Sequence, residues 1–328
     1  MYDVITAGSA TLDVFARTRF SELIKIIDPK GETDLLAFPS GSKILIDELE
    51  FTIGGGGTNT AVALSRLGHK VAFIGKLGTG TNSDFIHKNL KKEKIDLLCS
   101  HGKGHSGYSI ILDTLEHDRT ILTYKGINDE LRNKDIPYKK LKTKWFYFSS
   151  MLEESFHTLE SLAEFAQQHN IKVAFNPSTY LAEKGISHLK NIMSRTELLV
   201  LNKEEACLLV GKDLIDGLLL KLRSLGPRIV VITDGKHDLY VMDEKYIYAA
   251  KPPFVKVVDT TGAGDAFAAS FLSGIMRKNN VDFAIKLGLA NALSVIAHYG
   301  AKNILLGFSQ AMKSVNKMKV RIHKKKVK

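Results

Sequence analysis

Short apolar runs recur along the chain and alternate with helix-like stretches. The runs are residues 3–8, 70–75, 144–150, 172–176, 197–202 and 228–233. Each holds a nearly continuous β-rich core, which suits a strand buried on both faces of a sheet. Residues 153–170 repeat apolar side chains at the i, i+3, i+4 spacing of one helix face. The alternation predicts an α/β fold, with a mostly parallel sheet covered by helices on both sides.

Two segments interrupt this alternation. Residues 12–53 contain no strong helix pattern, and residues 107–125 form two β-rich runs around a polar turn at residues 116–118. Both favour antiparallel strands outside the main sheet. We expect them, at about 12–53 and 105–126, to form a small discontinuous β lid over one edge of the larger layer. No Pro/Gly-rich linker or repeat divides residues 1–316, so we predict a single domain there.

Composition limits the class of protein. The chain has 328 residues, of which 44% are hydrophobic, enough for a large core. No apolar run reaches the roughly 18 to 20 residues that cross a bilayer, and the N-terminus does not resemble a signal peptide. Two cysteines provide neither a disulfide scaffold nor a zinc site. We therefore expect a soluble, cytoplasmic protein without a membrane partner.

The net charge of +11 is concentrated at the C-terminus. Residues 317–328 hold seven Lys or Arg and no acid, and subtracting these seven charges leaves +4 for the remainder. Basic tails of this kind are mostly solvated, so we predict that residues 317–328 are disordered. The alternative is a weak electrostatic partner such as RNA or an acidic surface, although the mildly basic body argues against nucleic acid.

Two glycine-rich stretches carry the candidate chemistry. In "IGGGGTNTAVALSRLG", from Ile53, four glycines lead into a helix, more than a tight turn requires, which suggests a ligand against the backbone. In "VVDTTGAGDAFAASF", residues 257–271, Gly-Ala-Gly precedes a helix whose free N–H groups can bind an anion. Asp265, at the same helix start, is either an acid that favours a helix N-terminus or a base for a hydroxyl attacking a bound phosphoryl group.

Together these stretches closely resemble the two signatures of the ribokinase-like, or PfkB, carbohydrate kinases. The first is "GGGGTNTAVALSRLG" followed by "VAFIGKLG", and the second is "DTTGAGDAFAASFLSGI". The resemblance covers almost the whole chain except the basic tail. It implies a three-layer sandwich with a β lid, and transfer of the ATP γ-phosphoryl group to a hydroxyl of a sugar or sugar-like molecule.

The resemblance also implies residue roles. Asp265 matches the catalytic base, and Gly262, Ala263 and Gly264 match the anion hole. The positions that match acceptor-binding residues are Asp13, Gly54, Gly55 and Asn59. Those that match nucleotide-binding residues are Asn202, Thr233, Gly235, Gly262, Gly264 and Asn291. Glu205 corresponds to a residue that organises Mg²⁺, often through water, and Asp259 with Thr261 to a monovalent cation site, for example for K⁺.

Some departures of the sequence from the family pattern leave the identity of the acceptor open. Gly56 stands where ribose-specific members commonly have a lysine, and Asp238 replaces a second glycine after the "TDG" turn at residues 233–235. A nucleoside kinase of the same superfamily is the main alternative, and Phe15, Phe20 and Tyr108 are candidates to stack on a base. A non-catalytic binding protein on this fold is a remote alternative, which the intact Asp265 opposes.

An exposed lid edge also favours a homodimer.

Overall fold

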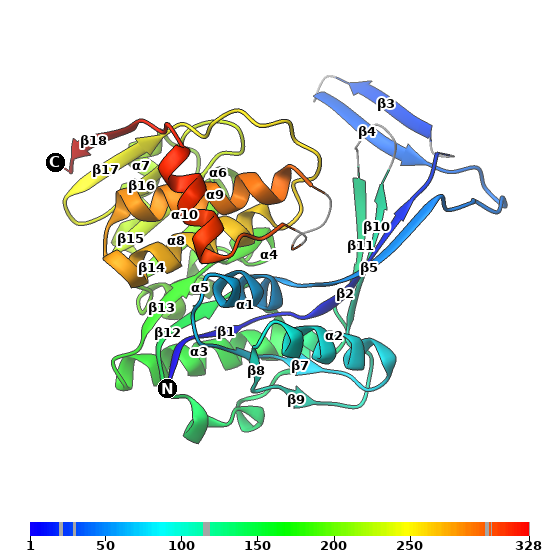
Figure 1. Cartoon of the computed structure of the whole chain (residues 1–328), viewed down its shortest axis with the longest axis horizontal. Helices are drawn as coiled ribbons and strands as arrows, with labels where there is room; N and C mark the ends of the chain where they lie inside the picture. The colour runs from blue at the N-terminus through cyan, green and yellow to red at the C-terminus, as the bar shows by residue number, and fades with distance from the viewer. Residues whose placement is uncertain (20–21, 29–30, 114–118, 299–301, 303, 328) are drawn as a thin grey trace.

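A large, mostly parallel sheet forms the middle layer of the molecule (Figure 1). The computed structural model describes residues 1–19, 22–28, 31–113, 119–298, 302 and 304–327. Within these residues, ten strands pair in the order β18–β17–β16–β15–β14–β13–β12–β1–β6–β8. The strands of the parallel part are β1 (Tyr2–Ala7), β6 (Val71–Ile74), β8 (Asp96–Leu97), β12 (Thr143–Phe148), β13 (Lys172–Phe175), β14 (Leu198–Asn202) and β15 (Ile229–Thr233). The predicted β-rich runs are confirmed as neighbours in this sheet.

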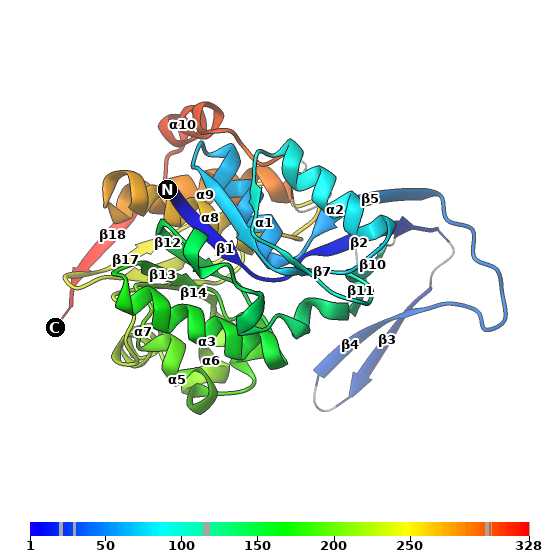
Figure 2. The same cartoon turned by 90° about the horizontal axis from the view of Figure 1, so that it is seen from below.

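The apolar side chains of these strands alternate between two hydrophobic layers. In β1, Val4 belongs to one buried cluster and Ile5 to the other, because successive side chains of a strand point to opposite faces. Helices cover both clusters (Figure 2). The helices on the first face are α1 (Gly56–Arg66), α2 (Thr81–Lys92), α8 (Ala263–Lys278) and α9 (Val281–Ile296), with α10 (Phe308–Lys317) outside them. Those on the second are α3 (Glu153–Gln168), α4 (Ser178–Ala182), α5 (Ile186–Met193), α6 (Lys203–Val210) and α7 (Ile215–Ser224). The result is the predicted three-layer arrangement.

A second sheet projects from the carboxyl edge of the main sheet as the lid (Figure 1). It has the order β11–β10–β2–β5, from β2 (Thr11–Arg17), β5 (Glu48–Gly54), β10 (Gly107–Asp113) and β11 (Arg119–Tyr124). The expected hairpin of β10 and β11 is confirmed; its turn at residues 116–118 lies outside the described residues. The expectation of antiparallel pairing throughout is wrong for β10 and β2, which run parallel. The hairpin arrives by a long crossover connection, and this allows the parallel orientation.

Smaller elements complete the described chain. The strands β3 (Glu22–Asp28) and β4 (Gly31–Ala37) form a separate hairpin beyond the lid sheet, and β7 (Lys76–Leu77) pairs with β9 (Ser100–His101). Short 3₁₀ helices, η1 (Gly126–Glu130), η2 (Asn133–Asp135) and η3 (Tyr138–Lys140), lead from the lid to β12. No helix in the described ranges is both long enough and apolar enough to cross a membrane.

The C-terminal end of the chain differs from the prediction. The antiparallel strands β16 (Leu239–Met242), β17 (Tyr246–Ala250) and β18 (Ile322–Lys326) extend the main sheet at one edge. The tail was expected to be disordered, and this is wrong for β18. Its backbone pairs with β17, while Lys324 and Lys325 form ion pairs with Asp282 and Asp216. An edge strand needs only one paired backbone side, so it tolerates these charged, exposed side chains.

Candidate active site

The first signature forms a glycine turn between the lid and helix α1. Gly55 has a φ of 93°, and a Cβ atom there would lie 2.5 Å from the Ser9 carbonyl oxygen, so a side chain is excluded by both conformation and contact. Gly57 and Gly8 approach each other similarly, since a Cβ on Gly57 would lie 2.7 Å from the Gly8 carbonyl carbon. The glycines thus bring the start of α1 against the end of β1.

Asp13 lies on lid strand β2 against this turn. Asp13 is 8% exposed, and its carboxylate accepts a hydrogen bond from Thr11 Oγ1 at 2.7 Å. A Cβ atom on Gly54 would lie only 1.8 Å from Asp13 Oδ2, so Gly54 leaves the space that this carboxylate occupies. The predicted acceptor residues Asp13, Gly54 and Gly55 therefore lie side by side.

The two signatures meet through one hydrogen bond. Asn59 Nδ2, on the first turn of α1, donates to Asp265 Oδ2 at 2.7 Å, although the residues are 206 positions apart. Asn59 Oδ1 is buried and has no hydrogen-bond partner among the described residues. A buried amide oxygen of this kind is costly unless a ligand supplies a donor. The arrangement leaves an acceptor group next to the candidate base.

Burial and neighbouring groups act on the pKa of the Asp265 carboxyl in opposite directions. Burial raises the pKa of the Asp265 carboxyl, and Asp13 raises it further, whereas the hydrogen bond from Asn59 and the charge of Lys302 lower it. The direction overall is upward. A carboxylate with a raised pKa accepts a proton more readily than an ordinary surface aspartate.

Helix α8 begins at the predicted anion hole. Gly262 caps the helix in a left-handed conformation, with φ of 75° and ψ of 0°. A Cβ atom on Gly264 would meet no heavy atom of the described residues within 4 Å, so packing among these residues does not require glycine there. The first N–H groups of a helix lack intrahelical partners and carry the positive end of the helix dipole. Open space in front of such groups has room for an anion.

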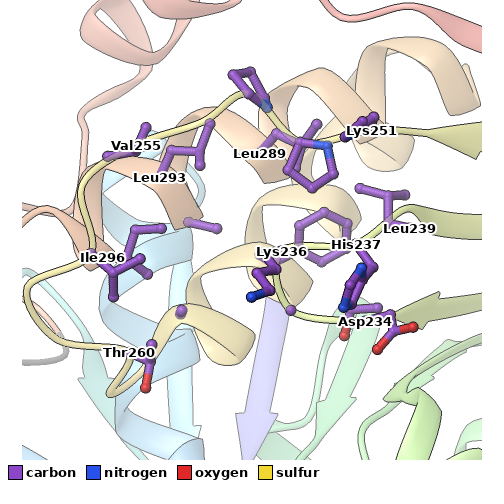
Figure 3. Close-up of a pocket in the computed structure, with 18 of the residues that line it drawn as sticks. Asp234, Lys236, His237, Leu239, Lys251, Val255, Thr260, Leu289, Leu293 and Ile296 are labelled. Atoms are coloured by element: carbon purple, nitrogen blue, oxygen red, sulfur yellow. The ribbon is translucent and has the colours of Figure 1, made fainter.

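A pocket of about 750 Å³ opens at this same helix end. Gly264 and Ala263 line it together with residues after β15, before α8 and on α9. Figure 3 shows the apolar Val255, Leu293 and Ile296 opposite the polar Asp234 and His237. One end can hold a flat apolar group and the other a polar one, as a nucleotide requires.

The predicted nucleotide residues separate into two sets. Thr233, Gly235 and Gly264 line the pocket, and Gly235 has a φ of 54° in the turn after β15. Asn202, Gly262 and Asn291 are not among the described residues that line the pocket. Asn291 is fully buried, donates to Ser270 Oγ at 2.8 Å and accepts from the Leu306 backbone N–H at 2.8 Å. Its side chain therefore joins helices α8 and α9 to the segment before α10.

Asn202 and Glu205 form a reciprocal cap at the start of α6. Asn202 Oδ1 accepts from the Glu205 N–H at 2.8 Å, and Glu205 Oε2 accepts from the Asn202 N–H at 2.9 Å. Thr179 Oγ1 donates to Glu205 Oε1 at 3.3 Å. Burial raises the pKa of the Glu205 carboxyl against these hydrogen bonds. With both oxygens engaged, Glu205 fits a metal contact through water better than a direct one.

Asp259 and Thr261 form a compact turn before the anion hole. Asp259 Oδ1 accepts from both the N–H and the hydroxyl of Thr261, at 2.8 and 2.7 Å. The Val258 and Asp259 N–H groups donate to the Ile296 carbonyl at the end of α9. Oxygen-bearing groups from the two segments are thus adjacent, as a monovalent cation site needs. Among the described residues, however, no cluster of three or more His, Cys, Asp or Glu residues forms a metal site.

Lys302 is a site residue that the sequence analysis missed. Its side chain is buried beside the glycine turn, where Nζ donates to the Ile53 carbonyl oxygen and lies 3.3 Å from Thr58 Oγ1. Burial lowers the pKa of Lys302 to about 7, although Asp13 and Asp265 act in the opposite direction. A single lysine after an apolar helix carries no sequence signal that separates it from a surface lysine.

Comparison with known proteins agrees with the two signatures. The sequence pattern of the pfkB family carbohydrate kinases matches residues 22–306. A cytidine kinase of Thermococcus kodakarensis is 29% identical over 275 residues, which cover 81% of this chain and 94% of that protein. A ribokinase of Staphylococcus aureus is 29% identical over 277 residues, covering 81% and 90%.

Structural comparison supports the same conclusion for the fold. The crystal structure of a ribokinase from Thermotoga maritima superposes with a TM-score of 0.80 at 20% identity, covering 96% of this chain and all of that one. The predicted ribokinase-like sandwich is confirmed. The chain therefore belongs to the pfkB family of carbohydrate kinases, which are phosphotransferases that phosphorylate a hydroxyl of a sugar-like acceptor with ATP.

Proposed function

We propose that Asp265 is the base of this kinase and that the backbone from Gly262 to Gly264 is its anion hole. The observation that carries the proposal is the 2.7 Å hydrogen bond between Asn59 and Asp265. It brings the glycine turn next to the open start of α8. An acceptor hydroxyl bound between them faces both a carboxylate and a phosphoryl group held by helix N–H donors.

The reaction then needs positioning more than covalent help from the protein. Asp265 takes the hydroxyl proton as the acceptor oxygen attacks the γ-phosphorus of ATP, and ADP leaves. The N–H groups at the start of α8 stabilise the charge on the transferring phosphoryl group. The lid limits access of water, which would otherwise compete as an acceptor.

The acceptor is bound by Asp13, Gly54, Gly55 and Asn59 in this proposal. Asp13 accepts hydrogen bonds from acceptor hydroxyls, and the unpartnered Asn59 Oδ1 accepts another. Gly54 and Gly55 let the acceptor approach the backbone. ATP occupies the pocket beside α9, with its phosphates toward Thr233, Gly235 and Gly264.

Metal ions belong to this proposal as well. Mg²⁺ would neutralise charge on the ATP phosphates when bound, and Glu205 would orient it through water, since both Glu205 oxygens already accept hydrogen bonds. Asp259 and Thr261 would hold K⁺ next to the anion hole and keep the Gly262 turn in place.

We also infer a cytoplasmic location, because ATP is the donor and both cysteines are free thiols.

A nucleoside acceptor is the second candidate, and Phe15 is the observation that favours it. Phe15 follows Asp13 by two residues on β2, so its side chain lies on the same face of the lid. Tyr108 pairs in register with Leu12 and thus lies on the opposite face. Phe20 falls outside the described residues. On that face, the aromatic ring of Phe15 is placed to stack on the base of a nucleoside acceptor.

An ATP-consumption screen tests the function. The purified full chain is assayed with D-ribose, 2-deoxy-D-ribose, D-fructose, a sugar acid, cytidine and adenosine, each with Mg²⁺ and either K⁺ or Na⁺. We expect acceptor-dependent formation of ADP and of a phosphorylated product, with a preference for sugars. Turnover of none of these acceptors would contradict the proposed function, and preference for cytidine or adenosine would favour the nucleoside alternative.

A homodimer through the lid is our proposal for the assembly. The face of the lid sheet opposite Asp13 exposes a set of large apolar side chains, and these are Leu49, Phe51, Ile110, Leu122 and Tyr124. An exposed apolar patch of this kind is typical of an interface. Two copies of the lid packed face to face would bury it.

A further inference from the structure

Lys302 connects both ends of the glycine turn. Its Nζ donates to the carbonyl oxygen of Ile53, just before the turn, and lies 3.3 Å from the hydroxyl of Thr58, just after it. Thr58 Oγ1 also donates to the Gly54 carbonyl oxygen at 2.5 Å. One ammonium group therefore holds both ends of the segment that carries Gly54 and Gly55.

The backbone of Lys302 is held as firmly as its side chain. Arg66 Nη1, in the last turn of α1, donates to the Lys302 carbonyl oxygen at 2.9 Å. The same guanidinium forms two hydrogen bonds with the Glu93 carboxylate, at 2.6 and 3.0 Å. Bidentate pairs of this kind have a defined geometry. Helix α1 is therefore fixed to Lys302 at both of its ends.

Two carboxylates act on the ammonium group from different elements. Asp13 comes from the lid and Asp265 from α8, and both favour the charged form of Lys302. Arg66 and Glu93 are the other charged groups that influence it, with opposite signs. In return, the charge of Lys302 lowers the pKa of Asp265, while Asp13 raises it. The cation thus offsets the repulsion between two acids that face one acceptor site.

We propose that Lys302 is a positioning residue of this kinase. It holds the glycine turn in the shape that binds the acceptor, and it supplies a positive charge that acts on the carboxylates of Asp13 and Asp265. This inference rests on the proposed role of Asp265 as the base. Neither effect requires Lys302 to touch the acceptor, because its ammonium group is already bonded to Ile53 and Thr58.

The first experiment compares two neutral replacements. Lys302→Met removes the charge and the donors, whereas Lys302→Gln removes the charge and keeps a donor. With the best acceptor of the sugar and nucleoside panel, we expect Lys302→Met to lower acceptor kcat/KM by roughly 10- to 150-fold, the value of a hydrogen bond to a charged group. Lys302→Gln should lower it less, and the KM for ATP should stay nearly unchanged in both.

The pH profile of activity separates the effect of the Lys302 charge from the effect of its hydrogen bonds to the glycine turn. Without the cation the pKa of Asp265 rises, so both variants should lose activity at a higher pH than the wild type on the acid side. Arg66→Gln is the matched control, because it loosens the Lys302 backbone and leaves the ammonium group in place. It should lower the melting temperature without moving the acid limb. A wild-type acid limb in both Lys302 variants, together with a wild-type acceptor KM, would overturn the proposal.

A second measurement needs no acceptor. Melting temperatures at pH 6.5 are compared for the wild type, Lys302→Met, Asp265→Asn and the double variant. Lys302→Met should lower the melting temperature more when Asp265 is present than in the Asp265→Asn background. The expected difference between the two decreases is on the order of 1 to 2 °C. Additive effects would overturn the coupling of Lys302 to Asp265. If the panel contains no acceptor, the proposed function fails while this cycle still decides the role of Lys302.

Discussion

Each carboxylate oxygen of Asp265 has a neighbouring residue, Asn59 on one side and Gly56 on the other, that limits the space around it. Asn59 donates to one of its oxygens, and a Cβ on Gly56 would lie 3.8 Å from the other. The described residues leave open space beside Gly264, so in the proposed mechanism an acceptor hydroxyl reaches the carboxylate from the start of α8. At the scale of residues, the proposed base and the proposed anion hole can therefore be tested by separate substitutions.

Asp265→Asn keeps the size of the side chain but removes its ability to take a proton. We expect turnover to fall about 10²- to 10⁴-fold, the usual contribution of a general base, with ATP affinity retained. Steady-state kinetics and calorimetric titration of ATP measure the two effects. Asp84→Asn is the control, since Asp84 is an exposed acid in the first turn of α2. Near-normal turnover of Asp265→Asn would reduce Asp265 to an acid that stabilises a helix start.

The pH dependence of the wild type reports the same residue. A base must be ionised, so kcat/KM should fall as the pH drops through the pKa of Asp265. Because burial raises this pKa, the fall should occur at a higher pH than for an ordinary aspartate. Initial rates in buffers of constant ionic strength measure it. A rate that persists unchanged to the ordinary aspartate range would argue against Asp265 as the base.

Gly264→Val tests the anion hole without disturbing packing. The new side chain points into open space in the protein, so the melting temperature should stay close to that of the wild type. A bound phosphoryl group would meet this side chain, and we therefore expect weaker ATP binding and slower turnover. Calorimetry with ATP and thermal melts provide the two readings. Unchanged ATP affinity would mean that the phosphates bind elsewhere.

At the scale of elements, β18 is the part of the chain whose role is least apparent from its composition. It pairs with β17 over Ile322–Lys326, and Met318, Val320 and Ile322 pack at the rim of the core. Its lysines form surface ion pairs, which contribute little individually. Backbone pairing and apolar contacts are therefore the larger part of its stabilisation.

Truncation after Lys317 leaves α10 intact and removes β18. We expect the free energy of unfolding to fall by about 1 to 3 kcal/mol, from lost apolar contacts and strand pairing. Urea denaturation measures it. In the control, Lys324→Gln with Lys325→Gln, only the ion pairs are lost, so a drop below about 1 kcal/mol is expected. Equal stability of the truncated and full chains would show that β18 adds nothing to the fold.

At the scale of the whole molecule, one face of the lid sheet carries Asp13, and the other exposes large apolar side chains in the part of the chain that the structure describes. Asp13 is on the first, and Phe51 and Leu122 are on the second. If the second face joins two copies, Phe51→Glu should convert a dimer to a monomer, because a charge would be buried against apolar side chains. Size-exclusion chromatography with light scattering measures the mass. Leu214→Glu, an exposed apolar position at the N-cap of α7, should leave it unchanged. A monomeric wild type would reject the lid dimer.

Much of the fold follows from patterns that are local in the sequence. The strands β1, β6, β12, β13, β14 and β15 and the helices α1 and α3 were predicted from runs of apolar residues and from helical spacing. These patterns work because a strand buried on both faces needs apolar side chains throughout, and a one-sided helix needs them every three or four residues. The disordered tail was a wrong prediction, since a charged edge strand has no such pattern.

The candidate site likewise contains residues that the sequence could suggest and residues that it could not place. Gly262, Gly264 and Asp265 could be proposed as a site from the sequence because they lie close together at a helix start, where free N–H groups favour an anion. Asn291 was expected at the nucleotide, but its amide bonds Ser270 and the Leu306 backbone inside the core. The family resemblance that suggested Asn291 could not reveal which way its side chain points.

By itself, the sequence determined the α/β alternation, the two glycine-rich turns and an acid at the start of a helix. All of these depend on residues within a few positions of one another. Only the tertiary structure decided that Asn59 bonds Asp265, that Lys302 holds the glycine turn, and that β18 closes the sheet edge. The partners in the first two contacts lie 206 and 249 positions apart in the chain. Such contacts depend on how the layers pack, which no local pattern encodes.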